Sequence, residues 1–260
     1  MRPSARGALP ERPGISFFFP ACNEEETVET LTRKAIETLP TLTDDWEVII
    51  VNDGSTDRTG EIADRLAREI PRVRVVHHPV NAGYGRALRS GFAEARKDLV
   101  FYTDGDLQFD IAELALLVPM IREADIVSGY KLRRADDAGR KVVSFVYNTL
   151  LKGLFGLRLT DVNCGFKLYR REIFDVIELK STRGLIDAEV LLKAQAVGYT
   201  ITQVGVHHFP RKHGSSRYRA REIFLTIVQM FTLWVDLRLG RGVRKPGAKS
   251  RGGDRGGDRS

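Results

Sequence analysis

Two carboxylates one residue apart, Asp104 and Asp106, have the types and spacing that best fit metal chemistry in this chain. They follow the apolar run of residues 99–102, which predicts a buried strand, and Gln108 adds a carboxamide two residues further on. Oxygen ligands of this kind favour Mg²⁺ or Mn²⁺ over zinc, and no Cys or His lies beside them. Because Mg²⁺ shares its ligand shell with substrate phosphates, the pattern predicts a metal–nucleotide site. The alternative is a plain acidic turn in which Asp110 caps the next helix.

Other polar turns follow the neighbouring predicted strands, at Asn23, Asp53 and Gly83. Strand and helix patterns alternate through the first half of the chain, which predicts βαβ units and a parallel sheet. Open α/β sheets bind ligands at the carboxyl ends of their strands, so we expect these turns and Asp104 to share one edge. The glycine loop of residues 81–85 lacks the third glycine of a dinucleotide fingerprint, and we interpret it as an ordinary strand-to-helix turn.

The expected fold class is α/β, with a mostly parallel central sheet flanked by helices. Apolar runs predict strands over residues 15–19, 46–51, 73–77, 99–103, 126–129 and 199–206, and a turn and strand over 161–169. Helical spacing predicts helices over residues 24–39 (capped by Asn23), 58–70, from the 81–85 loop to 96, 111–122, 142–157, 171–177, 186–197 and 222–239.

Composition is that of a soluble globular protein, with 42% hydrophobic and 29% charged residues in 260. The net charge of +7 lies mostly in residues 238–260, which carry +6, so the basicity belongs to a Gly-rich tail and predicts no nucleic-acid-binding face. Cys22 and Cys164 fit no disulfide framework or zinc spacing. Residues 1–14 lack the apolar region of a signal peptide. Together these features predict reduced thiols and a cytoplasmic location.

The chain is expected to divide into a disordered N-terminus (1–13), a catalytic domain (14–220), an amphipathic interfacial helix (221–239) and a disordered basic Gly-rich tail (240–260). The apolar part of the last helix, residues 223–235, spans about 20 Å, short of the roughly 30 Å hydrocarbon core of a bilayer. This helix and the apolar residues 142–157 are expected to serve as core, as a dimer interface, or as membrane helices lying in the bilayer plane at the cytoplasmic face.

The acidic turns resemble the successive signatures of family 2 glycosyltransferases of the GT-A fold. The matching segments are Pro20 with Asn23-Glu24, residues 51–57 (V-N-D-G-S-T-D) and residues 104–106 (D-G-D). Three more segments resemble the polyprenyl-phosphate sugar transferases, the dolichol-phosphate mannose synthase branch: the L-Q extension after D-G-D, residues 161–167 (D-V-N-C-G-F-K) and residues 211–216 (R-K-H-G-S-S). The resemblance covers about residues 15–220.

The resemblance implies a role for each matched position. Pro20, Glu24 and Asp53 would contact the nucleoside, and Asp104, Asp106 and Gln108 would hold Mg²⁺ or Mn²⁺ and the donor diphosphate. The positions expected to face the phosphates and the acceptor are Arg133, Arg134, Lys167, Arg211, Ser215 and Ser216. Cys22 stands where the branch often has an aromatic residue, which leaves the choice between guanine and uracil open.

The implied reaction is a metal-dependent, inverting transfer of a hexose onto a polyprenyl phosphate, with GDP-mannose as the favoured nucleotide sugar. The catalytic positions expected are Asp104, Asp106, Asp161 and Asp187. An acceptor phosphate is already ionised near neutral pH, whereas an alcohol acceptor would need a carboxylate base, for which Asp161, Asp187 and Glu189 are candidates. The alternatives are UDP-glucose as donor, a cell-envelope polysaccharide hydroxyl as acceptor, or a non-catalytic nucleotide-sugar-binding protein.

Overall fold

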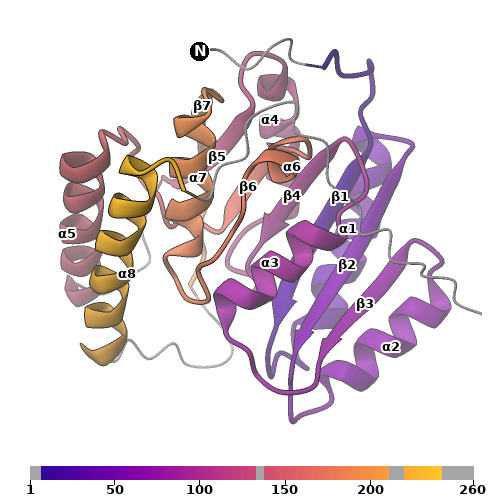
Figure 1. Cartoon of the computed structure of the whole chain (residues 1–260). Helices are drawn as coiled ribbons and strands as arrows, with labels where there is room; N and C mark the ends of the chain where they lie inside the picture. Colours follow the sequence, from indigo (N-terminus) through magenta and orange to yellow (C-terminus); the bar gives the residue numbers. More distant parts are fainter. Residues whose placement is uncertain (1–6, 133–137, 211–219, 242–260) are drawn as a thin grey trace, which may run out of the picture.

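A seven-stranded sheet in the order β3-β2-β1-β4-β6-β5-β7 forms the centre of the computed structural model, which describes residues 7–132, 138–210 and 220–241 (Figure 1). Within it, β6 is antiparallel to both neighbours and every other pairing is parallel. The predicted α/β class with a mostly parallel sheet is confirmed. The strands are β1 (Ile15–Ala21), β2 (Trp46–Asp53), β3 (Val73–His78), β4 (Leu99–Thr103), β5 (Ile126–Lys131), β6 (Phe166–Arg170) and β7 (Ile201–Val206).

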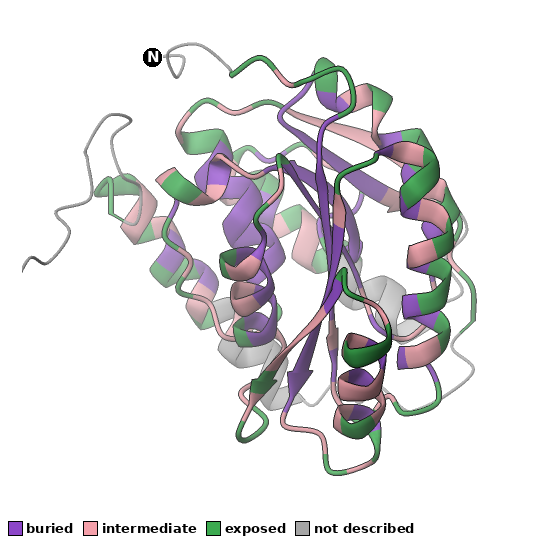
Figure 2. Cartoon of the chain, turned by 90° about the vertical axis from the view of Figure 1, so that its right-hand side faces the viewer, coloured by how far each residue is buried: buried purple, intermediate pink, exposed green. Residues whose placement is uncertain are grey.

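Helices cover both faces of the sheet, and the buried residues alternate between them (Figure 2). In β1, Phe17 and Phe19 join one core, and Phe18 joins the other. Burial on both faces explains why these strands read as continuous apolar runs. The helices are α1 (Val28–Leu42), α2 (Thr59–Glu69), α3 (Tyr84–Glu94), α4 (Leu114–Leu117), α5 (Ala138–Phe155), α6 (Ile173–Val176), α7 (Ile186–Ala196) and α8 (Ala220–Arg238).

Three predicted helices differ from those observed, and one of them, expected over 142–157, is α5, which begins at Ala138. The first begins at Val28 rather than residue 24, because Asn23 adopts a positive φ of 56° and its side chain accepts from Thr56 N at 2.8 Å instead of capping the helix. The helix expected over 111–122 is divided into two 3₁₀ turns and the short α4, with Pro119 starting the second turn. Asp110 does cap this region, accepting from Ala112 N at 3.1 Å.

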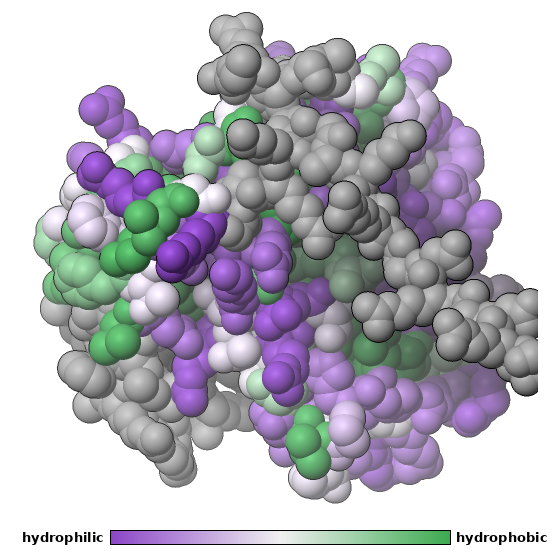
Figure 3. Space-filling view, in the orientation of Figure 1, coloured by the Kyte–Doolittle hydropathy of each residue, from purple (hydrophilic) through white to green (hydrophobic). Residues whose placement is uncertain are grey.

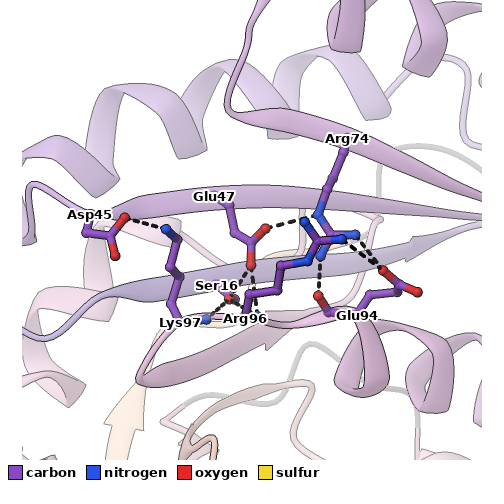
Figure 4. A network of polar contacts seen from close by, with 7 residues as sticks. All are labelled: Ser16, Asp45, Glu47, Arg74, Glu94, Arg96 and Lys97. Carbon is purple, nitrogen blue, oxygen red and sulfur yellow. Dashed lines mark hydrogen bonds and ion pairs between the residues drawn. The ribbon is translucent and has the colours of Figure 1, made fainter.

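At the amino ends of β1, β2 and β3, a buried polar network joins the three strands (Figure 4). Glu47 accepts from Ser16 Oγ at 2.6 Å, from Arg74 Nε at 3.0 Å and from Arg96 N at 3.0 Å. Burial opposes ionisation of Glu47, but these hydrogen bonds outweigh it and lower its pKa. The network joins the three strands at the sheet edge opposite the acidic turns.

The chain before β1 also contacts the domain. Gly7 O accepts from Arg170 at 2.9 Å, and Leu9 packs against the first core. Part of the segment expected to be disordered, residues 7–13, thus contacts the domain, while 1–6 lie outside the described residues, and the expected division of the chain remains a prediction. At the other end, Arg241 N donates to Asp236 O at 2.8 Å, and the predicted tail from 242 onward lies outside the described part of the chain.

Helices α5 and α8 lie side by side next to α7 (Figure 1). Leu151 of α5 and Met230 and Leu233 of α8 are buried in the second core. The same helices leave large apolar side chains exposed: Phe145, Val146, Val228, Phe231 and Val235. Apolar residues appear among hydrophilic ones over these helices in the space-filling view (Figure 3). Among the described residues, no helix has the length and hydropathy needed to span a membrane.

Candidate active site

The carboxyl ends of three neighbouring strands bring the predicted acidic positions to one edge of the sheet. β1 lies between β2 and β4, with Pro20 opposite Val51 and Ala21 opposite Asn52. The turn after β1 is therefore flanked by Asp53 on one side and Asp104 on the other. This common edge was predicted from the alternation of strands and helices, and the topology confirms it.

Asp53 is buried and shapes the segment after β3. It accepts from Ala82 N and Gly83 N, each at 2.9 Å, and His78 Nδ1 lies 2.6 Å from its Oδ1. The other ring nitrogen of His78 is 2.9 Å from Ser90 Oγ. Gly83 has a positive φ of 91°, which favours glycine at this turn. Asp53 thus joins β2, β3 and the start of α3, and its expected nucleoside contact remains a prediction.

Backbone and hydroxyl groups join the turn after β1 to both neighbours. Glu24 N donates to Thr59 Oγ1 at 2.8 Å, which joins the turn to α2. Thr27 Oγ1 lies 3.1 Å from Glu24 Oε2 and 2.7 Å from Gly105 O. Gly105 is the residue between Asp104 and Asp106 in the turn after β4. The half-buried Glu24 carboxylate is therefore oriented beside the D-G-D turn, on the side where a nucleotide is expected.

Close packing surrounds Asp104. A Cβ at Gly105 would lie 2.5 Å from Pro20 O, and one at Gly165 would lie 2.2 Å from Asp104 Oδ2. Tyr84 donates its hydroxyl to Asp104 Oδ1 at 2.9 Å. Burial, and then the charge of Asp104, raises the pKa of Tyr84 well above its usual value, so the hydroxyl keeps its proton.

Electrostatics at the two carboxylates fit a divalent cation. Burial first, then the charges of Asp106 and Asp187, raises the pKa of Asp104 to about 7. A bound cation would offset this accumulation of negative charge. Among the residues that the structure describes, no group of three or more His, Cys, Asp or Glu is arranged to hold a metal. The ligand set predicted from the sequence, Asp104 and Asp106, would suffice where water and a substrate diphosphate supply the rest, and it remains a prediction.

The carboxamide of Gln108 has a partner that the sequence did not predict. Gln108 Nε2 donates to Phe209 O at 2.9 Å, and Phe209 N donates back to Gln108 O at 2.8 Å. Close by, His207 N donates to Glu113 Oε2 at 2.8 Å. The turn after the acidic pair thus holds the segment that follows β7. The metal contact expected of Gln108 remains a prediction, and it would use the side-chain oxygen.

Lys167 and Asp187 form a buried ion pair beneath the acidic turn. Lys167 is fully buried on β6, Asp187 is 5% exposed in the first turn of α7, and Lys167 Nζ lies 2.6 Å from Asp187 Oδ1. Tyr102 of β4 donates to the same carboxylate, and its hydroxyl is 3.1 Å from Lys167 Nζ. The predicted roles of Lys167 in binding phosphate and of Asp187 in catalysis remain predictions. Both side chains have partners inside the protein and connect β4, β6 and α7.

A sequence model of the family described as Glycosyl transferase family 2 matches residues 16–177, a span that contains β1 to β6 and all the acidic turns. The chain belongs to glycosyltransferase family 2. Glucosyl-3-phosphoglycerate synthase from Mycobacterium tuberculosis, solved in complex with Mn²⁺, UDP and glucosyl-3-phosphoglycerate, superposes with a TM-score of 0.63. The match covers 88% of this chain and 81% of that chain at 23% identity, and it confirms the GT-A-type fold.

Curated relatives share more of the sequence. Glycosyltransferase AglD of Haloferax volcanii is 37% identical over 207 residues, which are 76% of this chain and 33% of that protein. Dodecaprenyl-phosphate galacturonate synthase of Rhizobium johnstonii is 30% identical over 232 residues, 86% of this chain and 67% of the relative. An undecaprenyl-phosphate 4-deoxy-4-formamido-L-arabinose transferase of Pseudomonas fluorescens is 29% identical, over 84% of this chain and 64% of that protein. The chain therefore spans between a third and two thirds of these relatives' lengths.

Of the other site residues that the family resemblance implied, the structure describes Asp161 and Glu189 but not the phosphate-facing arginines and serines. Asp161 is buried at 2% exposure, and its expected role toward the acceptor remains a prediction. Glu189 is buried, accepts from Lys180 N at 2.9 Å and Ser181 N at 2.7 Å, and pairs with Lys193. Its candidacy as a base remains a prediction. The expected phosphate-facing residues Arg133, Arg134, Arg211, Ser215 and Ser216 lie outside the described residues.

Sequence reasoning missed the neighbours that support the family's acidic motif. Tyr84, Thr27 and Gly165 each contact the D-G-D turn from another part of the chain. A signal for Tyr84 was present, because a hydroxyl placed directly after a glycine turn at the same sheet edge is within reach of the acids. Thr27 and Gly165 carry no comparable local signal.

Proposed function

We propose that this chain is a metal-dependent, inverting glycosyltransferase that moves a hexose from a nucleotide sugar to a polyprenyl phosphate. One observation carries the proposal. Asp104 and Asp106 stand at the end of β4, beside the turns of β1 and β2, in surroundings that make their combined negative charge unfavourable without a cation. Two of the relatives bear names of transferases acting on dodecaprenyl or undecaprenyl phosphate, which supports the acceptor class.

Each set of residues has a part in this reaction. Pro20, Glu24 and Asp53 line the nucleoside side, and Asp104 with Asp106 holds the cation and orients the diphosphate. The cation, Mg²⁺ or Mn²⁺, would stabilise the charge that develops on the departing diphosphate by several kcal/mol. Positioning of donor and acceptor then supplies much of the remaining rate enhancement.

The acceptor is more consistent with a phosphate than with an alcohol. An alcohol must lose its proton to a base, but Asp187 and Glu189 are occupied by buried ion pairs with Lys167 and Lys193. A phosphate is ionised near neutral pH and needs no such base. Asp161 remains the one candidate for an alcohol acceptor among the three carboxylates considered.

We also propose that the protein works at a membrane surface, where a polyprenyl phosphate resides. Exposed apolar side chains on α5 and α8, including Phe145 and Phe231, would enter the interface. The cations of residues 238–260 would favour an anionic leaflet, each adding up to roughly 1 kcal/mol. The location proposed is peripheral, at the cytoplasmic face.

GDP-mannose is the donor that we propose first, with UDP-linked hexoses as the competing donors. The decisive experiment incubates the protein with a panel of radiolabelled nucleotide sugars, Mn²⁺ or Mg²⁺, and polyprenyl phosphate. Label in the organic phase would name donor and acceptor together. EDTA should abolish the transfer, and added Mn²⁺ or Mg²⁺ should restore it.

The Asp106→Asn variant serves as the catalytic control, with an expected loss of at least about a hundredfold in rate. A non-catalytic nucleotide-sugar-binding protein would bind a donor of the panel without transferring it to any acceptor. That result, or transfer that persists in EDTA, would contradict the proposal.

A further inference from the structure

The turn from Ala82 to Tyr84 touches both acidic positions of the site. Ala82 N and Gly83 N donate to Asp53 at 2.9 Å. One residue later, Tyr84 donates its hydroxyl to Asp104 Oδ1 at 2.9 Å. Three consecutive residues therefore connect the nucleoside side, at the end of β2, with the cation side, at the end of β4.

Packing holds Tyr84 in place independently of Asp104. The next residue, Gly85, is buried, and a Cβ there would lie 2.5 Å from Arg183 N, so the first turn of α3 rests directly on the backbone before α7. The Tyr84 ring packs against the second core, and its hydroxyl lies beside that of Tyr102. Because the ring is held from these sides, it presents a donor at a fixed position.

We propose that Tyr84 is a positioning residue for the cation site, whose hydroxyl holds Asp104 Oδ1 so that the carboxylate meets the cation in one orientation. This rests on the metal site of the proposed function and adds a residue from outside the acidic motif. Gly165 lies against the other oxygen, Oδ2, and leaves the carboxylate little room to rotate. Hydrogen bonds of this kind orient metal ligands, and losing one typically costs ten- to a hundredfold in metal affinity.

The Tyr84→Phe variant tests this role, since it removes the hydroxyl and keeps the ring that packs. Mn²⁺ binding to the full chain is measured by electron paramagnetic resonance, with Mn²⁺ alone and with excess UDP or GDP. We expect the dissociation constant for Mn²⁺ to rise about tenfold. Binding of UDP or GDP in EDTA should change by less than about twofold, because the Asp53 contacts come from the backbone of the turn.

Tyr169→Phe is the matched control. Tyr169 lies in the second core, against which Tyr84 packs, with its ring centroid 6.3 Å from that of Tyr102, and its buried hydroxyl has no hydrogen-bond partner in the described chain. Its Mn²⁺ affinity should equal that of the wild type.

Unchanged Mn²⁺ affinity in Tyr84→Phe, or an equal loss in Tyr169→Phe, would overturn the role of Tyr84 while leaving the cation site in place. A wild-type protein that binds no Mn²⁺ with either nucleotide would overturn the metal site itself, and the positioning role with it. The two failures are therefore distinguishable.

Discussion

At the scale of single residues, the site depends on positions where no side chain fits. Gly105 lies against the carbonyl of Pro20, and Gly165 lies against the carboxylate of Asp104. Gly165 O also accepts a backbone hydrogen bond from Asp104 N at 3.3 Å, so the residue before β6 contacts the acidic turn through its main chain. The contacts of Gly165 restrict the orientation of Asp104 from a part of the chain that is distant in sequence.

Replacing Gly165 by Ala should disable the cation site. The new Cβ would lie 2.2 Å from Asp104 Oδ2, so the carboxylate must move. We expect Mn²⁺ affinity and the transfer rate each to fall at least about tenfold, measured by paramagnetic resonance and by label transfer.

Gly153→Ala is its control, because a Cβ there meets nothing within 4 Å in the exposed part of α5. It should leave both quantities unchanged and raise the free energy of unfolding by roughly 0.5–1 kcal/mol. Wild-type Mn²⁺ binding in Gly165→Ala would show that the carboxylate relocates without loss.

At the scale of elements, the antiparallel strand β6 carries the buried cation that joins the elements around the site. It lies between β4 and β5, and so places Lys167 against Asp187 of α7 and Tyr102 of β4. The pair joins three elements directly below the acidic turn. The charge of Asp187 also contributes to the raised pKa of Asp104. Asp187 therefore affects the site through its charge as well as through the contacts that join these elements.

Lys167→Met should destabilise the protein strongly. It leaves the Asp187 carboxylate buried without its cation, and breaking a buried pair from one side typically costs about 3–5 kcal/mol. Chemical denaturation measures the change. Lys180→Met is the control, because Lys180 Nζ is 3.7 Å from Asp236 at an exposed site, and surface pairs contribute less than about 1 kcal/mol. Equal effects of the two variants would contradict a structural role for Lys167.

At the scale of the whole molecule, charge and exposed apolar surface are unevenly distributed. The sheet and its acidic edge form the body of the protein, while α5 and α8 lie together at one side (Figure 1). Basic residues concentrate from the last residue of α8 onward, where 238–260 carry +6 of the total +7. An apolar helix face followed by cations is the arrangement expected at an anionic membrane surface.

Phe231→Glu should weaken membrane binding. Phe231 is 53% exposed on α8, and the substitution replaces apolar contact with a charge that anionic lipid repels. We expect the fraction of protein that sediments with anionic vesicles at low salt to fall at least about tenfold. Transfer to a short-chain, water-soluble acceptor should survive.

Leu116→Glu controls for the substitution itself, since Leu116 is 50% exposed on α4, away from α5 and α8. It should sediment like the wild type. A wild-type chain that stays in the supernatant with anionic vesicles at low salt would exclude the proposed membrane surface.

The strands and the acidic edge were predictable because their signals are local. Apolar runs identify the strands of a sheet buried on both faces, and polar residues mark where each strand ends. Chain direction in parallel βαβ units then places Asp53 and Asp104 at one edge without further information. The predicted start of the first helix was wrong because local sequence does not show which partner a side chain finds. Asn23 could cap the helix, but its Oδ1 accepts from Thr56 N on the neighbouring turn instead.

The sequence by itself determined the fold class, the shared edge of acids and membership of a nucleotide-sugar transferase family. Only the tertiary structure decided what each charged side chain does there. Lys167 and Asp187 satisfy each other inside the protein, and Tyr84 and Gly165 control the orientation of Asp104. A buried charge must find a partner, and which partner it finds depends on elements that are distant along the chain and adjacent only after folding.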